Sequence, residues 1–395
     1  MRTYRELFRT PEYAPLFASR TLSIAGTTVS GLALGTLVFT ATGSPLLSAL
    51  SMFGPALAQV LGATLLMSAA DRLPPRGALT WLVALIGAGT AAQAIPGMPI
   101  GWLFAILFVE GVLTSLLGGV RFGLLNEILP PGGFLLGRSV MNMSDGTMQI
   151  CGFAIGGVLV AVLTPRGTLL AGAVLFLVAA ATARTGLSAR PARASGRPSI
   201  TATWRANARL LSSPPRLYVY LALWVPNGLI VGCESLFVSY TPAHAGTLLA
   251  AAALGMLAGD TLMGRFVPVR HRERLSAPLR LLLAVPYVVF AFHPPLPLAA
   301  AAAALASIGY SASLLLQDRL TRLTPDDLSG HALGLGSSGV MTMQGVAAAL
   351  AGTVAQYTSP ATAMTVMAAL SITITLALTP GLRPHPTGQA ANPTP

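Results

Sequence analysis

Three acidic residues stand inside long apolar stretches of the chain: Glu110 in FVEGVL, Asp145 in VMNMSDGTMQ and Glu234 in VGCESL. A charged side chain at the centre of a bilayer costs roughly 2.5–3.5 kcal/mol on insertion scales, so such residues usually have a task. A carboxyl group held away from water can take up and release protons near neutral pH. We expect the three acids to bind protons or a cationic ligand. The sequence also allows a neutral, hydrogen-bonded Glu110 and a Glu234 that reaches the outer interface.

The surroundings of Asp145 predict a helix with two different ends. At 100° per residue, five residues fall within an arc of roughly 80° on one helix face: Asn142, Asp145, Gln149, Gly152 and Gly156. The polar end of this face could line a cavity, and the glycines allow close approach of another helix. The alternative for Asp145 is a structural ion pair with Arg121 or Arg138. Arg20, early in the first apolar segment, is expected to extend toward the interface.

The composition indicates that lipid is the solvent of this chain. Hydrophobic residues make up 53% of the 395 residues and charged residues only 9%, whereas about a quarter of a soluble chain is charged. Apolar segments of about 20 residues, long enough to cross a bilayer as helices, recur along the whole length. The sequence therefore predicts an all-α membrane protein.

Twelve apolar segments are predicted to be membrane spans. They lie at about 14–40, 46–69, 78–96, 101–124, 138–163, 165–186, 217–241, 245–266, 276–293, 296–317, 330–356 and 359–380. With a cytoplasmic N-terminus, all but one of the 24 basic residues, Arg166, fall at cytoplasmic ends or loops. This positive-inside pattern predicts that both termini are cytoplasmic.

The spans divide into two halves of six. The predicted units are an N-terminal six-helix bundle at 1–186, a basic cytoplasmic linker at 187–216 and a C-terminal six-helix bundle with a short tail at 217–395. The sequence TMQ at 147–149 recurs at 342–344, and the same spacing relates Gly157 to Gly352. Such a repeat is typical of transporters that work by alternating access.

Over essentially its whole length the chain resembles the major facilitator superfamily, and its first 80 residues resemble the macrolide and siderophore (enterobactin-type) exporter branch. PLFASRTLS, LVFTATGSPLLSAL and SAADRLPPRG follow the opening order of that branch, and GFAIGG at 152–157 is similar to an exporter motif of the fifth span. The resemblance implies two pseudo-symmetric six-helix bundles. It also implies that Gly152, Gly156 and Gly157 form a helix-packing motif.

The same resemblance implies a cytoplasmic gate made of charged residues, with solvated loop charges as the alternative. The candidates are Asp71, Arg72, Arg76, Arg121, Asp260, Arg265, Asp326 and Asp327. A second group could line the cavity, or simply pack between helices: Asn142, Gln149, Trp224, Asn227, Gln344, Met141 and Met343. Flexible Met side chains suit substrates of varied shape.

These features predict a transporter of the plasma or inner membrane that exports a small, partly hydrophobic compound, such as a drug, antibiotic or secondary metabolite, in exchange for protons. We expect a monomer with no cofactor, no metal and no nucleic-acid partner. Neither a GxxxxGK[ST] phosphate loop nor an HExxH motif occurs in the sequence, and no arrangement predicts an enzyme. An importer of a small metabolite and a non-transporting membrane sensor remain alternatives.

Overall fold

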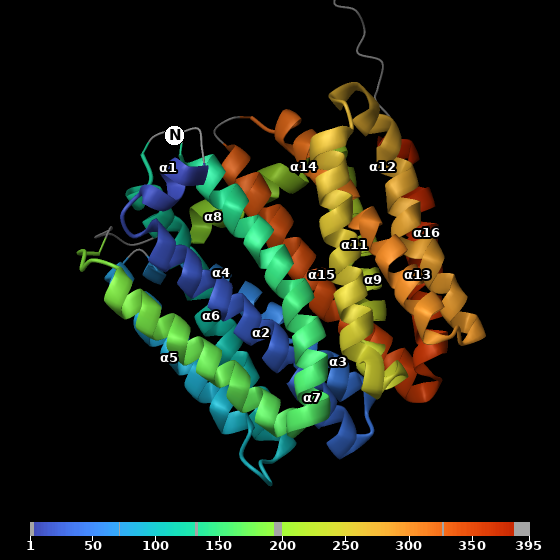
Figure 1. Cartoon of the computed structure of the whole chain (residues 1–395). Coiled ribbons are helices and arrows are strands. Elements are labelled where there is room, and N and C mark those ends of the chain that lie inside the picture. The colour runs from blue at the N-terminus through green and yellow to red at the C-terminus, as the bar shows by residue number, and fades with distance from the viewer. Residues whose placement is uncertain (1–3, 71, 131–132, 193–199, 326–327, 383–395) are drawn as a thin grey trace, which may run out of the picture.

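The computed structural model of the chain describes residues 4–70, 72–130, 133–192, 200–325 and 328–382. Within these ranges the chain is helical and contains no β-strand. Figure 1 shows long helices that run side by side between two ends of the molecule.

The first half of the chain contains seven helices in the described ranges. They are α1 (Tyr4–Arg9), α2 (Tyr13–Thr42), α3 (Pro45–Phe53), α4 (Pro55–Ala70), α5 (Pro75–Gln93), α6 (Ile100–Ile128) and α7 (Phe134–Gly186). Proline begins α3, α4 and α5, where its missing N–H would have no helical partner in any case. Gly43, with φ of 65°, ends α2, and the Ser44 hydroxyl accepts a bond from Leu47 N to cap α3.

The second half begins with the short linker helix α8 (Ile200–Leu211). The following elements are α9 (Pro214–Glu234), α10 (Phe237–Tyr240), η1 (Pro242–His244), α11 (Ala245–Thr261), η2 (Leu262–Phe266), α12 (Val269–Ala284), η3 (Val285–Phe292), α13 (Leu296–Ile308), η4 (Gly309–Ser311), α14 (Ala312–Arg322), α15 (Ser329–Tyr357), α16 (Pro360–Leu378) and η6 (Pro380–Leu382).

Helix α7 is two helices joined by a single residue. Thr164 has φ of 66° and ψ of 164°, far from helical values, and Pro165 follows it. A β-branched residue with positive φ is uncommon and strained. The chain therefore reverses direction where the sequence predicts the boundary between the fifth and sixth spans.

Ten helical segments of the described chain are long and apolar enough to cross a membrane. One of them, Leu136–Gly186, contains the break at Thr164, and α5 adds a further helix of 19 residues. Large apolar side chains such as Val162 and Phe292 are exposed on the outside of the molecule, as expected for side chains in contact with lipid. The arrangement is consistent with twelve membrane-crossing segments.

The helices pack as two bundles, each with its own core. In the first, α2 packs along α7, α5 packs against α6 and α7, and α4 packs against α6. In the second, α9 packs against α15 and α16, and α11 packs against α13. Tyr13 and Phe176 belong to the first core, whereas Phe237 and Tyr287 belong to the second.

The main contacts between the bundles join α7 to α11 and join α15 to both α3 and α4, while the short α10 also contacts α2 and α3. At the first contact a Cβ on Gly246 would lie 2.8 Å from Gly157 Cα, and at the second a Cβ on Gly352 would lie 2.6 Å from Leu46 Cα. Both distances are shorter than real Cβ contacts, so only glycine permits these approaches.

The two ends of the molecule differ in their contacts. At the α1 end, which holds α1, the start of α5 and the end of α7, the Ser188 hydroxyl donates to Glu12 Oε1 at 2.7 Å. At the opposite end, which we call the loop end, the Ser44 hydroxyl of the first bundle donates to Gln356 Oε1 of the second at 2.7 Å. The loop end therefore carries a polar contact between the bundles.

Candidate functional site

Asp145 forms an ion pair with Arg20 of α2, not with Arg121 or Arg138. The Arg20 Nε donates to Asp145 Oδ1 at 2.9 Å and to Oδ2 at 3.1 Å, and Nη2 also donates to Oδ2. Both side chains are largely buried, with exposed fractions of 17% and 16%. Arg20 thus turns toward α7, where a bidentate carboxylate satisfies its planar guanidinium.

Arg121 lies inside α6 next to this pair and is only 7% exposed. Its Nη2 donates to the Ser23 hydroxyl at 2.8 Å, while its Nε is buried with no hydrogen-bond partner in the described chain. Arg20 and Asp145 are close enough to interact with it electrostatically. The Arg20–Asp145–Arg121 cluster therefore holds two cations and one anion.

Glu110 faces α5 and contacts neutral groups. Its Oε1 lies 3.2 Å from the Thr90 hydroxyl, and its Oε2 accepts a hydrogen bond from Gln93 Nε2 at 3.2 Å. A Cβ on Gly89 would lie 2.7 Å from the same Oε1, so a glycine in α5 makes room for the carboxyl group. No described basic side chain lies within ion-pair distance of Glu110.

Glu234, the last residue of α9, is 7% exposed inside the second bundle. Its Oε1 accepts hydrogen bonds from the Tyr310 hydroxyl at 3.2 Å and, more weakly, from the Ser307 hydroxyl at 3.5 Å. The buried Tyr287 interacts with the same carboxyl group. As at Glu110, no basic side chain of the described residues lies within ion-pair distance of Glu234.

The polar candidates of the second bundle join α9 to α15. The Trp224 Nε1 donates to the Gly336 carbonyl oxygen at 3.0 Å, and Gln344 Nε2 donates to Asn227 Oδ1 at 3.4 Å. Close to these bonds, the Met343 carbonyl oxygen lies 2.7 Å from the Cβ position of Gly228. These contacts join the two helices, and a cavity-lining role for the residues stays a prediction.

The candidates of α7 occupy different environments. Asn142 is exposed and Gln149 half-buried, whereas Met141 is buried in the core of the first bundle. Gly152 and Gly156 lie against Thr28 and Val29 of α2, and Gly157 contacts Gly246 of α11. The GFAIGG segment therefore packs α7 against both bundles, although its role in transport stays a prediction.

No ion pair joins the gate candidates of the described part of the chain. Arg72 is exposed after α4, Arg76 is half-buried in α5, and Asp260 and Arg265 are exposed at the end of the α11 and η2 segment. Asp71, Asp326 and Asp327 lie outside the described residues. No group of three His, Cys, Asp or Glu that could hold a metal occurs among the residues searched.

Sequence reasoning missed the partners of the acids more than the acids themselves. Thr90 and Gln93 are three residues apart and share one face of the third predicted span, which is a signal that could have pointed to Glu110. Arg20 and Asp145 are separated by 125 residues, and no pattern in a single sequence links them.

Comparisons with known proteins show the fold. No protein-family model matches the chain, and no curated protein matches it in sequence. Among solved structures, it is similar to a POT family transporter in complex with 5-aminolevulinic acid (TM-score 0.74, 12% identity, covering 94% of this chain and 96% of the other).

Two further solved structures are similar over most of the chain. A bacterial homologue of the human lysosomal transporter Spinster, in an inward-facing and unoccupied conformation, matches with a TM-score of 0.70, 13% identity and 97% of both chains. The nucleoside transporter NupG matches with a TM-score of 0.70, 14% identity, 93% of this chain and 100% of the other. The predicted all-α major facilitator fold is confirmed, and the chain is a multi-pass membrane protein.

Proposed function

We propose that this protein is a secondary active transporter that exports a small, partly hydrophobic compound, such as a drug, antibiotic or secondary metabolite, in exchange for protons. The observation that carries the proposal is the absence of a charged partner for Glu110 and Glu234 among the described residues. Each is an acidic residue on a membrane-spanning helix, and neither has a basic partner within the described chain. A carboxyl group without a counter-ion can be neutralised by a proton alone.

The hydrogen bonds of Glu110 favour a proton-carrying role. The Thr90 hydroxyl has one hydrogen, and its bond to the Ile86 carbonyl oxygen (2.9 Å) is shorter than its contact with Glu110 (3.2 Å). If Thr90 donates to Ile86, a protonated Glu110 can donate to the Thr90 oxygen, which has lone pairs to accept it. The site can therefore satisfy a protonated carboxyl group.

Asp145 differs from the two glutamates because it already has a charged partner, Arg20. Its ion pair with Arg20 must break before a proton can replace the arginine as its partner. We therefore assign coupling first to Glu110 and Glu234. Asp145 is a coupling residue only in a conformation that separates α2 from the start of α7.

Alternating access is the movement that the fold supports. The two proposed units, 1–186 and 217–395, would rock about the contacts of α7 with α11 and of α3 with α15, with residues 187–216 as the linker. The contact between Ser44 and Gln356 would close the loop end. The arginine pattern orients the α1 end toward the cytoplasm.

The test is gradient-driven export. Drug susceptibility of a host that expresses the full chain, measured across chemical classes, selects a compound for transport assays in everted vesicles. We expect accumulation of that compound when the vesicle lumen is acidic, loss of accumulation with a protonophore, and loss of uphill accumulation in Glu110→Gln. Accumulation in right-side-out vesicles only would establish an importer. Absence of any flux would favour a sensor, and full uphill transport in Glu110→Gln and Glu234→Gln would refute the coupling assignment.

A further inference from the structure

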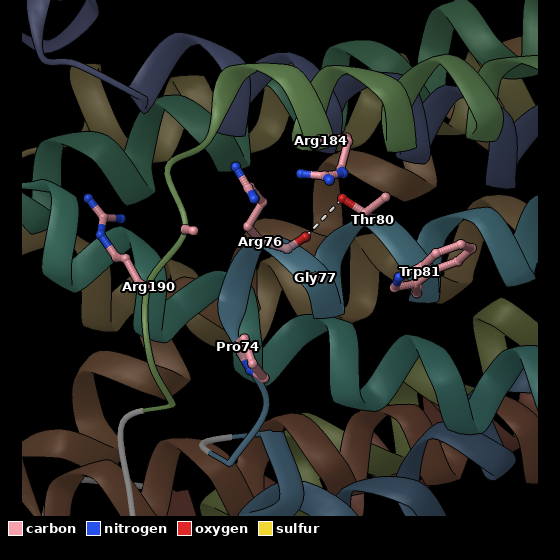
Figure 2. Close-up of a pocket in the computed structure, with 8 residues that line it drawn as sticks. Pro74, Arg76, Gly77, Thr80, Trp81, Arg184 and Arg190 are labelled. Carbon is pink, nitrogen blue, oxygen red and sulfur yellow. Dashed lines mark hydrogen bonds between the residues drawn. The ribbon is translucent and has the colours of Figure 1, made fainter.

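A basic pocket lies at the α1 end, on the first bundle. Its volume is about 270 Å³, below the roughly 300–1,000 Å³ of pockets for drug-sized ligands. Figure 2 shows that its walls come from the start of α5, the end of α7 and the segment after α7. The lining residues are Pro74, Arg76, Gly77, Thr80, Trp81, Arg184, Ala189 and Arg190.

The charge of the pocket is positive and incompletely compensated. Arg190 Nη2 forms an ion pair with Glu12 Oε1 at 3.1 Å. Arg190 Nη1 is buried and has no hydrogen-bond partner among the described residues. Arg76 and Arg184 have no carboxylate partner among the described residues. Counted over the described residues, three arginines and one glutamate leave two positive charges at this pocket.

The start of α5 adds hydrogen-bond donors to the same place. The helix begins at Pro75, and the first four N–H positions of a helix have no partner within it. The amides of Arg76 and Gly77 belong to this first turn, and both residues line the pocket. Free amides at a helix N-terminus together with guanidinium groups are the donors that bind phosphate oxygens.

An apolar surface continues from the pocket along α5 and α7. Trp81 is 70% exposed, and Leu85, one turn further along α5, is also exposed. On α7, Leu177 and Val174 are exposed on the face that leads to Arg184. The two helices are in direct contact, since a Cβ on Gly87 would lie 3.7 Å from Leu177 Cδ2. An exposed Trp between a basic pocket and an apolar face is typical of the membrane–water interface.

We propose that this pocket binds the phosphate-bearing headgroup of an anionic phospholipid, whose acyl chains lie along the exposed faces of α5 and α7. The cationic pocket accounts for the headgroup, and the adjoining apolar surface favours a lipid over a free phosphate. The lining residues belong to the first bundle, except Ala189 and Arg190 of the linker, and none belongs to α11 or α15. The site is therefore separate from the proposed transport pathway.

The experiment measures lipid binding by the purified full-length protein. Phosphatidylglycerol and phosphatidylcholine are titrated separately in detergent, and bound lipid is counted by native mass spectrometry. We expect preferential binding of phosphatidylglycerol, weakened at least about tenfold in Arg76→Gln/Arg184→Gln, because each basic residue near a surface contributes about 1 kcal/mol to anionic lipid binding. The matched control, Arg9→Gln/Arg209→Gln, removes two exposed arginines from the same end and should bind as the parent does.

A second variant tests the site without removing an arginine. A Cβ on Gly77 would meet no atom within 4 Å, so Gly77→Asp places a carboxylate in open space. An acid in the first turn also suits the helix dipole, so the fold should persist. Gly77→Asp should lose phosphatidylglycerol, while Gly77→Asn should retain more of it.

Two results would overturn the proposal. One is equal phosphatidylglycerol binding by the parent, the double-arginine variant and Gly77→Asp. The other is displacement of the lipid by sn-glycerol 3-phosphate at equal concentration, which would identify a site for a soluble phosphate. Failure of glycerol phosphate to compete, together with loss of lipid in the pocket variants only, would establish the lipid site.

Discussion

Asp145 in the first bundle and Glu234 in the second are both acids on membrane-spanning helices, yet their neighbours differ. Asp145 is held by Arg20 beside a second arginine, Arg121. Glu234 is surrounded by hydroxyl groups, from Tyr310 and Ser307. The first acid compensates fixed positive charge, whereas the partners of the second among the described residues are neutral.

This difference separates two tasks that acidic residues perform in a membrane. A carboxylate that compensates arginines keeps a bundle intact, and its loss leaves buried cations unpaired. A carboxyl group among hydroxyls can exist with or without a proton, because a hydroxyl both donates and accepts hydrogen bonds. Position within a span is therefore a poorer guide to coupling than the charge of the partners.

The largest expected effect is on uphill transport in Glu234→Gln. The amide can still accept hydrogen bonds from Tyr310 but cannot carry a proton. We expect gradient-driven accumulation to fall at least about tenfold, within the usual range of coupling free energies, while substrate exchange without a gradient continues. Initial rates in vesicles measure both quantities.

Glu127→Gln is the matched control for that experiment, since Glu127 is an exposed acid at the α1 end of α6. It should keep uphill transport. Unchanged uphill transport in Glu234→Gln would remove the second-bundle acid from the mechanism.

The next effect, on stability, belongs to Asp145→Asn. The substitution leaves Arg20 and Arg121 without a carboxylate, so the free energy of unfolding should fall by roughly 1.5–3 kcal/mol, the range for hydrogen bonds to charged groups. Denaturation in detergent checks this value. Arg20→Gln/Asp145→Asn should be more stable than the sum of the single losses predicts. Strictly additive losses in the double variant would show that Arg20 and Asp145 do not stabilise each other. A similar loss of unfolding free energy in Glu234→Gln would contradict the difference between Asp145 and Glu234.

The smallest effect is expected from Tyr310→Phe. It removes one hydrogen bond to Glu234, which contributes about 1 kcal/mol, so transport should fall by no more than about fivefold. Tyr357→Phe, at an exposed position on α15, is the control. A complete loss of transport in Tyr310→Phe would mean that the hydroxyl itself conducts the proton.

The helices were largely predictable because hydropathy and turn residues act locally. The first predicted span, 14–40, corresponds to α2 (Tyr13–Thr42), and the predicted boundary between 163 and 165 falls on the break at Thr164. Pro165 is the local signal for that break, since proline cannot continue a helix without losing a hydrogen bond. The division of the second span at Gly54 and Pro55 was not predicted, since the apolar pattern runs through it.

The candidate sites were only partly predictable. The costly acids Glu110, Asp145 and Glu234 are visible in a single sequence because each interrupts an apolar segment. Their partners are not visible, because tertiary packing brings Arg20 to Asp145 and Tyr310 to Glu234 across long separations. The packing of Met141 in a core also depends on which helix face the fold turns inward.

The one-residue turn at Thr164 has a mechanical consequence. Helix α7 carries Gly157 against the second bundle on one side of the turn and Phe176 against Gly87 of α5 on the other. Because no loop separates these two arms and both pack against the first bundle, a rocking first bundle must carry both arms together. The far arm ends near Arg184, at the rim of the basic pocket. If the bundles rock as proposed, the basic pocket therefore moves with the first bundle and changes its position relative to the lipid headgroups.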